Sequence, residues 1–237
     1  MAALHRWRLT EPGPAVFLPD MKAVTSGVAK HSFALPNLLT YARIAAVPVV
    51  VACMYAQAIL QGGLWLRLVA LAIFIVAGVT DFLDGYLARS WGQQSRLGRM
   101  LDPIADKLLV ASCLLMLAAD ETIKGWSLFA AIIILCREIL VSGLREYLAE
   151  LRVSVPVTQL AKWKTTLQLV AIGFLLAGEA LDPFLPREVL EWRMRSGSEY
   201  IPFANMIGLT LLWLAALLTL YTGWDYFRAG VRHLIDD

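Results

Sequence analysis

Four aspartates between two apolar runs are the residues of this chain best suited to chemistry. Asp81 and Asp84 are three positions apart, and Asp102 and Asp106 are four apart. Each pair therefore lies on one face of its segment if that segment is helical. A carboxylate at the centre of a membrane helix costs about 2.5–3.5 kcal/mol on insertion scales, so something must compensate for these four. Two such helices face to face would hold a cluster of hard oxygen ligands, which suits Mg²⁺ or Mn²⁺.

The composition is that of a membrane protein. Of the 237 residues, 59% are hydrophobic and only 17% are charged, which is too apolar for an ordinary soluble domain. The cysteines, Cys53, Cys113 and Cys136, all lie inside apolar runs, so we expect neither a disulfide framework nor a zinc site. The net charge is +2, and no nucleic-acid partner is expected.

The hydrophobic pattern predicts an all-α polytopic membrane protein with six transmembrane helices around a polar cavity. The apolar segments have roughly the length that a bilayer core requires, although the third is short. They cover residues 44–60, 65–86, 101–119, 126–147, 163–181 and 203–224. We expect residues 1–33 to be an irregular polar extension, residues 34–228 to be the membrane domain, and residues 229–237 to be a short tail. No signal peptide is expected, and Met21 could be the true start instead of Met1.

The segments between the apolar runs predict where the helices begin and end. Gly62-Gly63 predicts a turn, and a polar loop is expected over 89–99. Asp102 could be the N-cap of the third helix with Pro103 at its first position, or that helix could start a turn earlier. Most of the 21 lysines and arginines lie on the same side as the termini and the aspartates. Because cytoplasmic loops carry the excess of these residues, both termini and the aspartate cavity are expected to face the cytoplasm.

The pattern Asp-x2-Asp-Gly-x2-Ala-Arg-x8-Gly-x3-Asp-x3-Asp, from Asp81 to Asp106, resembles the signature of the CDP-alcohol phosphotransferase family. It matches without a gap or substitution. A diphosphate needs divalent cations, and Asp81, Asp84 and Asp102 are the natural ligands for two ions of Mg²⁺ or Mn²⁺. The resemblance implies that Asp106 is the base that takes the proton of the attacking hydroxyl, and it could also contact the second metal.

Further residues of the signature bear on the CDP-linked substrate. Gly85 and Ala88 are small, so a nucleotide could approach Gly85 closely, and Arg89 at the membrane surface can pair with a phosphate. Gly98 is placed with them, and the reaction implied is attack of an alcohol on the lipid-side phosphorus of CDP-diacylglycerol with CMP leaving. The alternatives are tight helix packing for Gly85 and a plain turn for Gly98.

Arg137, Arg145 and Lys162 bear on which alcohol is accepted. Charges within or beside apolar spans are expected to point into the bundle, and three cations beside the metal site would suit a phosphorylated acceptor. A free alcohol would not need three. The alternative is that these side chains snorkel or pair with Glu138 and Glu146.

Longer stretches resemble one branch of the family, namely Leu35–Arg43, Leu101–Leu109, Cys136–Glu146 and Lys162–Thr166. That resemblance implies sn-glycerol 3-phosphate as the acceptor, held by the three basic residues, and phosphatidylglycerol phosphate as the product. It also implies a homodimer, and a bacterial inner membrane is the best-fitting location. No function is carried onto residues 1–33 or 182–200.

Other readings stay open. Family members that make cardiolipin, phosphatidylserine or phosphatidylinositol phosphate share the aspartates and differ in the acceptor pocket. A divalent-cation transporter is a more remote alternative. It would need polar residues through the opposite half of the spans, and that half is almost uniformly apolar in the second, third and fifth.

Overall fold

The computed structural model describes residues 35–91, 96–150, 159–184 and 201–235. Within these ranges every regular element is a helix and there is no strand, so the predicted all-α class is confirmed. One α-helix corresponds to each of the six apolar segments. The elements are α2 (Leu35–Ala58), α3 (Trp65–Trp91), α4 (Arg96–Ala119), α5 (Ser127–Glu150), α6 (Gln159–Ala177), the 3-10 helix η1 (Gly178–Phe184) and α8 (Phe203–Ile235).

The helix boundaries differ from the predicted apolar segments at several ends. α2 already begins at Leu35, nine residues before the first segment. α3 continues to Trp91 and α4 begins at Arg96, so the loop predicted over 89–99 is too long. α8 continues to Ile235, well past the predicted end of the sixth apolar segment. Hydropathy marks the length that suits lipid, whereas backbone hydrogen bonding can continue a helix into polar sequence. The predicted Gly62-Gly63 turn is confirmed, since Gly63 has a φ of 92° that favours glycine.

Four of the helices are long and apolar enough to cross a membrane. They include the segments Leu38–Ala58, Ser127–Ala149, Trp163–Phe184 and Phe203–Arg228. α3 and α4 are not among them over the described residues. The membrane character is therefore clear, and the prediction of six spans stays a prediction.

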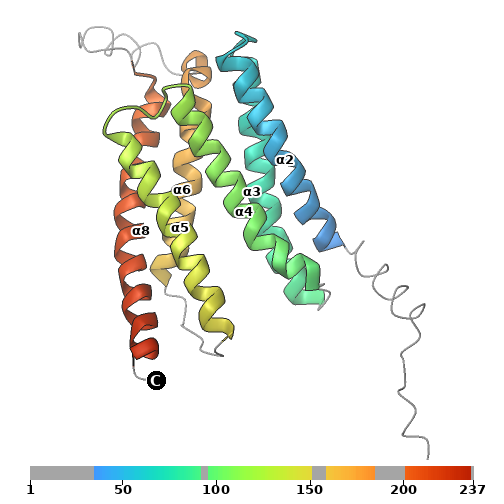
Figure 1. Ribbon diagram of the computed structural model, residues 1–237. Helices are drawn as coiled ribbons and strands as arrows, with labels where there is room; N and C mark the ends of the chain where they lie inside the picture. The colour runs from blue at the N-terminus through green and yellow to red at the C-terminus, as the bar shows by residue number, and fades with distance from the viewer. Residues whose placement is uncertain (1–34, 92–95, 151–158, 185–200, 236–237) are drawn as a thin grey trace, which may run out of the picture.

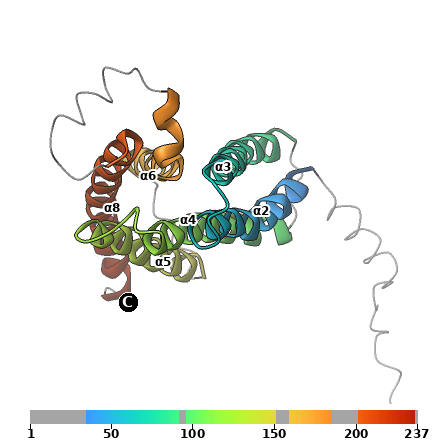
Figure 2. The same cartoon turned by 90° about the horizontal axis from the view of Figure 1, so that it is seen from above.

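The helices form two groups that share one apolar core. α2 packs against both α3 and α4, while α5 and α6 pack against α8, and α3 contacts α6 between the groups (Figure 2). Every α-helix supplies buried side chains to the core, among them Met54, Phe74, Leu114, Ile134, Ile172 and Leu212. Over the described residues α3 and α4 do not form a closely packed pair. The two aspartate helices are therefore joined through α2 rather than lying directly face to face.

Successive helices alternate in direction, which brings distant parts of the sequence to one end of the bundle (Figure 1). The C-terminal end of α3, the first turns of α4, the end of α5, the beginning of α6 and the end of α8 all lie at the lower end in this view. The aspartates, Arg145 and Lys162 belong to these parts, whereas Arg137 lies near the middle of α5. The alternation thus brings the aspartates, Arg145 and Lys162 toward the same end of the bundle.

The opposite end contains a buried charged pair that locks three elements together. The Arg67 guanidinium in the first turn of α3 lies 3.3 Å from the Asp120 carboxylate, which follows α4. It also donates to the carbonyl oxygens of Leu175 and Leu176, each at 3.0 Å, and so caps the C-terminus of α6. The cap is tight because a Cβ on Gly178, whose φ is +48°, would lie 3.0 Å from Arg67 Nε. The Arg67 and Asp120 charges thus compensate each other within the fold.

Arg67→Met is expected to destabilise the fold by about 3–5 kcal/mol, because it leaves the Asp120 carboxylate buried without its cation and the α6 carbonyls without a donor. Thermal unfolding in detergent measures the loss. Arg228→Met is the matched control, since the Arg228 side chain is exposed on α8. Equal melting temperatures for the two variants would contradict the locking role of Arg67.

Candidate active site

α2 contributes a buried arginine to the aspartate region. Arg43 Nη1 lies 2.5 Å from Asp81 Oδ1, and the Arg43 side chain is 1% exposed while that of Asp81 is 45% exposed. The long apolar stem of Arg43 fits the surrounding core while its charged end reaches the carboxylate. Arg43 thus compensates part of the cost of placing Asp81 among apolar helices.

The same face of α2 contacts the second aspartate pair. The Thr40 hydroxyl, one turn before Arg43, donates a hydrogen bond to Asp102 Oδ1. Residues three apart share a helix face, so Thr40 and Arg43 together link α2 to α4 and α3. Neither residue was assigned a role from the sequence. The available signal was two polar residues at helical spacing where an apolar segment begins.

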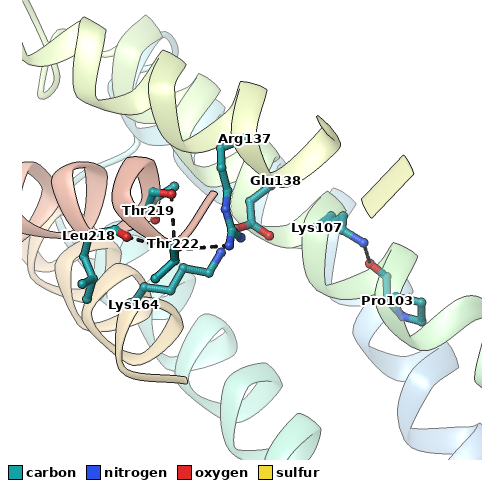
Figure 3. Close-up of polar contacts among 8 residues, drawn as sticks. All are labelled: Pro103, Lys107, Arg137, Glu138, Lys164, Leu218, Thr219 and Thr222. Atoms are coloured by element: carbon teal, nitrogen blue, oxygen red, sulfur yellow. Dashed lines mark hydrogen bonds and ion pairs between the residues drawn. The ribbon is translucent and has the colours of Figure 1, made fainter. Parts of the chain in front are cut away.

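Asp106 lies one turn after Asp102 on α4 and is partly buried. Its carboxylate lies within the range of direct charge–charge interaction with Asp81, Arg43, Glu138 and Lys107. Lys107 itself donates to the Pro103 carbonyl at 3.2 Å (Figure 3). Asp106 is therefore close enough to interact with one aspartate of α3, Asp81, and with one charged residue of α5, Glu138.

The other residues of the aspartate pattern are placed only in part. Asp84, Gly85, Ala88 and Arg89 belong to the last turns of α3, and their side chains lie outside the described residues. Gly98 is buried in the first turn of α4, so the alternative of a plain turn there is wrong. Asp102 and Pro103 lie inside α4 rather than at its start. The helix therefore begins before Asp102, as the second prediction said, and Asp102 is not its N-cap.

A second charged cluster joins α5, α6 and α8. Arg137 Nη1 lies 2.9 Å from Glu138 Oε1, and Lys164 Nζ bonds to the same oxygen. Arg137 Nη2 also donates to Thr222 Oγ1 at 3.3 Å. Figure 3 shows these four side chains pointing toward one another. We call Arg137, Glu138, Lys164 and Thr222 the basic cluster.

The structure describes the side chains of two of the three predicted basic residues, Arg137 and Arg145. Arg137 is paired with Glu138, as the alternative interpretation of its charge anticipated. Arg145 is exposed and its guanidinium lies over the ring of Tyr226, 5.7 Å from the centroid. Lys162 is in the first turn of α6, and its side chain lies outside the described residues. Lys164, which was not predicted as a site residue from the sequence, is buried in the same region.

An apolar cavity of about 530 Å³ lies between α3 and α6. Its lining includes Leu71, Phe74, Gly78, Leu169, Gly173 and Phe174. Gly78 is three residues before Asp81, so the cavity begins about one helical turn from the aspartates. Added Cβ atoms on Gly78 and Gly173 would meet nothing within 4 Å, which shows that the space is open at both glycines.

Residues 33–221 match the CDP-alcohol phosphatidyltransferase family, which is most of the chain. The chain belongs to that family. Similar proteins named CDP-diacylglycerol–glycerol-3-phosphate 3-phosphatidyltransferase occur in several bacteria. The one from Cereibacter sphaeroides is 41% identical over 224 residues, which are 87% of this chain and 99% of the relative. The Rickettsia bellii protein is 42% identical over 84% of this chain and 96% of the relative, and the Shigella flexneri serotype 5b protein is 37% identical over 86% and 98%.

CDP-alcohol phosphatidyltransferases generally use divalent metal ions, and the donor chemistry of this chain fits them. The candidate ligands are all carboxylates, which are the hard oxygen donors that Mg²⁺ and Mn²⁺ prefer. Among the residues whose side chains are described, no group of three or more His, Cys, Asp or Glu is gathered tightly enough to hold a metal. Asp84 is outside that set. Asp81 is 45% exposed even though Arg43 pairs with its Oδ1.

Proposed function

We propose that this protein transfers the phosphatidyl group of CDP-diacylglycerol to sn-glycerol 3-phosphate, giving phosphatidylglycerol phosphate and CMP. The carrying observation is that the chain matches, over almost their whole length, relatives named for this transfer. The geometry is consistent with two substrates meeting at one place. Asp106 of α4 interacts electrostatically both with Asp81 of α3 and with Glu138 of the basic cluster.

In this proposal Asp81, Asp84 and Asp102 hold two ions of Mg²⁺ or Mn²⁺, and Asp106 is the base. When bound, the ions neutralise the diphosphate and the charge that develops on the leaving phosphate. Asp106 takes the proton from the acceptor hydroxyl, which makes that oxygen a better nucleophile toward the lipid-side phosphorus. Arg43 and Thr40 keep Asp81 and Asp102 oriented, because each bonds directly to one of those carboxylates.

The remaining assignments concern substrate binding. Gly85, Ala88, Arg89 and Gly98 are proposed to receive the CDP part of the donor at the cytoplasmic ends of α3 and α4. Arg137, Arg145 and Lys162 are proposed to hold the phosphate of the acceptor. Lys164 joins them, since it is buried beside Arg137 in the basic cluster.

The apolar cavity is suited to one acyl chain of the donor. It runs along α3 from Leu71 to Val79, roughly 12 Å at 1.5 Å per residue, and it begins one turn from Asp81. A lipid whose head group lies at the aspartates could therefore place a chain against α3 and α6. Burial of each methylene contributes about 0.8 kcal/mol, so a chain of this length gains substantially from the cavity.

Gly173→Phe is expected to fill the cavity and raise the KM for dioleoyl CDP-diacylglycerol roughly tenfold, the cost of displacing about two methylenes. The KM for a dihexanoyl substrate should change little, because its chains are too short to reach that depth. Gly143→Phe is the control, since Gly143 is exposed on α5 with equally open surroundings. A similar rise in KM for the dioleoyl and dihexanoyl donors would show that the cavity does not bind the acyl chain.

The proposed reaction is tested with purified protein, CDP-diacylglycerol and Mg²⁺ or Mn²⁺, with CMP release as the readout. We expect release with glycerol 3-phosphate and not with serine, inositol phosphate or phosphatidylglycerol. CMP release with one of the other acceptors would agree with the proposed role of the aspartates but would show that glycerol 3-phosphate is not the acceptor. Absence of metal-dependent release with every acceptor would overturn the transferase assignment and favour the transporter alternative.

The setting of the reaction is also part of the proposal. The excess of Lys and Arg beside the aspartates supports an active site and both termini on the cytoplasmic side of a bacterial inner membrane. A homodimer is proposed from the family resemblance. Labelling of single cysteines placed at Glu146 and Trp126 with a membrane-impermeant reagent in spheroplasts tests the orientation, because the two positions lie at opposite ends of α5.

A further inference from the structure

Glu138 is the one carboxylate of the basic cluster, and two cations share it. Arg137 from its own helix and Lys164 from α6 both contact the same oxygen, Oε1 (Figure 3). The Glu138 side chain is 22% exposed, so it is not sealed inside the core. A carboxylate that two cations hold at an accessible position resembles a bound anionic ligand.

Positive charge exceeds negative charge in and around the cluster. Arg137 and Lys164 carry two positive charges against the single negative charge of Glu138. Arg145 adds to the positive potential at Lys164, and the Asp106 carboxylate interacts with Glu138, so three cations still face two carboxylates. The Arg137 side chain is 90% buried, and its Nε has no hydrogen-bond partner among the described residues. Buried donors of this kind are normally satisfied, so the cluster has an unused donor as well as unused charge.

We propose that Glu138 is an internal anion that occupies the acceptor-phosphate site and sets the charge an acceptor must carry. In the empty site it holds Arg137 and Lys164 together. A phosphate dianion has more charge and more acceptor oxygens than one carboxylate, so it can displace Glu138 and also satisfy Arg137 Nε. A neutral alcohol offers no charge to replace that of Glu138 and leaves it in place.

This inference rests on the proposed function for the identity of the acceptor, but the anion site can be measured separately. Inorganic phosphate is the probe, and its effect on the melting temperature of the full-length protein in detergent reports binding without turnover. The KM for glycerol 3-phosphate, with CMP release as the readout, reports the same site during the reaction.

Glu138→Gln removes the competing charge and keeps the shape. We expect the KM for glycerol 3-phosphate to fall about tenfold, and phosphate to stabilise the variant at about tenfold lower concentration than the parent protein, because a like charge beside the bound dianion is gone. Glu146→Gln makes the same charge change on an exposed residue two turns further along α5 and should leave both quantities unchanged.

A purely structural Glu138 predicts the opposite sign. Without Glu138, Arg137 and Lys164 would repel each other and separate, so the KM for glycerol 3-phosphate would rise and phosphate would bind no better. That result, or an unchanged KM, would overturn the proposal. Glu138→Asp is the second variant, in case the first does not fold. It keeps the charge on a shorter side chain, and its KM should lie between those of the parent and the Gln variant; a KM at or above the parent value would count against the proposal. Stronger phosphate binding in a protein that does not use glycerol 3-phosphate would support the anion site and overturn the proposed function alone.

Discussion

Asp106→Asn is expected to reduce metal-dependent CMP release by roughly 10²–10⁴-fold, the range for removing a general base. An amide keeps the size of the side chain but cannot take the proton of the acceptor hydroxyl. Binding of CDP-diacylglycerol should persist, because Asp81, Asp84 and Asp102 remain to hold the metal. Turnover and calorimetric binding, measured in the same detergent and at the same metal concentration, check both parts.

The control for this variant is Glu179→Gln, which removes an exposed carboxylate from η1 at the other end of the bundle. It should retain both turnover and binding. If Asp106→Asn loses donor binding to the same degree as turnover, then Asp106 serves mainly as a metal ligand and another group must take the proton.

Arg137→Met is expected to raise the KM for glycerol 3-phosphate by about 10–100-fold and to leave the KM for CDP-diacylglycerol nearly unchanged. A charge-assisted hydrogen bond contributes about 1.5–3 kcal/mol, and each 1.4 kcal/mol corresponds to a factor of ten in affinity. The effect should be selective because Arg137 belongs to the basic cluster on α5 and α8, whereas the donor is proposed to bind along α3 and α4. Steady-state kinetics with each substrate varied in turn measures both constants.

Arg137→Lys and Arg228→Met serve as the comparisons for this prediction. Lysine keeps the charge and loses the planar fork, so part of the acceptor affinity should return. Arg228→Met removes a charge from the exposed surface of α8 and should change neither KM. An equal rise in both KM values for Arg137→Met would show that Arg137 does not bind the acceptor specifically and instead stabilises the helix bundle.

The two predictions together test one geometric idea, that donor and acceptor meet at Asp106. Asp106 interacts electrostatically with Asp81 of α3 and with Glu138 of α5. An acceptor whose phosphate is held at the basic cluster could present its hydroxyl toward Asp106. Selective loss of turnover in one variant and of acceptor affinity in the other is the pattern that this arrangement requires.

Features that depend on neighbouring residues could be predicted from the sequence. The six helices follow from the lengths of the apolar segments, and the Gly62-Gly63 turn follows from the conformational freedom of glycine. The aspartate pattern from Asp81 to Asp106 led to the family through residue types and spacing alone. Local periodicity carries this information because the repeat of a helix is the same wherever the helix is placed.

Contacts between helices could not be predicted in the same way. Lys164 is buried against Glu138 but was not predicted as a site residue, and the side chain of the predicted Lys162 lies outside the described residues. Residues two positions apart on a helix are rotated by about 200° about its axis, so the contact of Lys164 depends on how α6 is turned toward α5 and α8. That rotation is decided by packing of the whole core.

The partners of the aspartates show the same division. The sequence determined that Asp81 and Asp102 need compensation for their charge, because carboxylates are costly among apolar helices. Only the tertiary structure decided that Arg43 and Thr40 of α2 contact them, and that Arg67 pairs with Asp120 at the other end. The cost of an uncompensated charge is a property of residue type, whereas the partner that relieves it depends on which helices pack side by side.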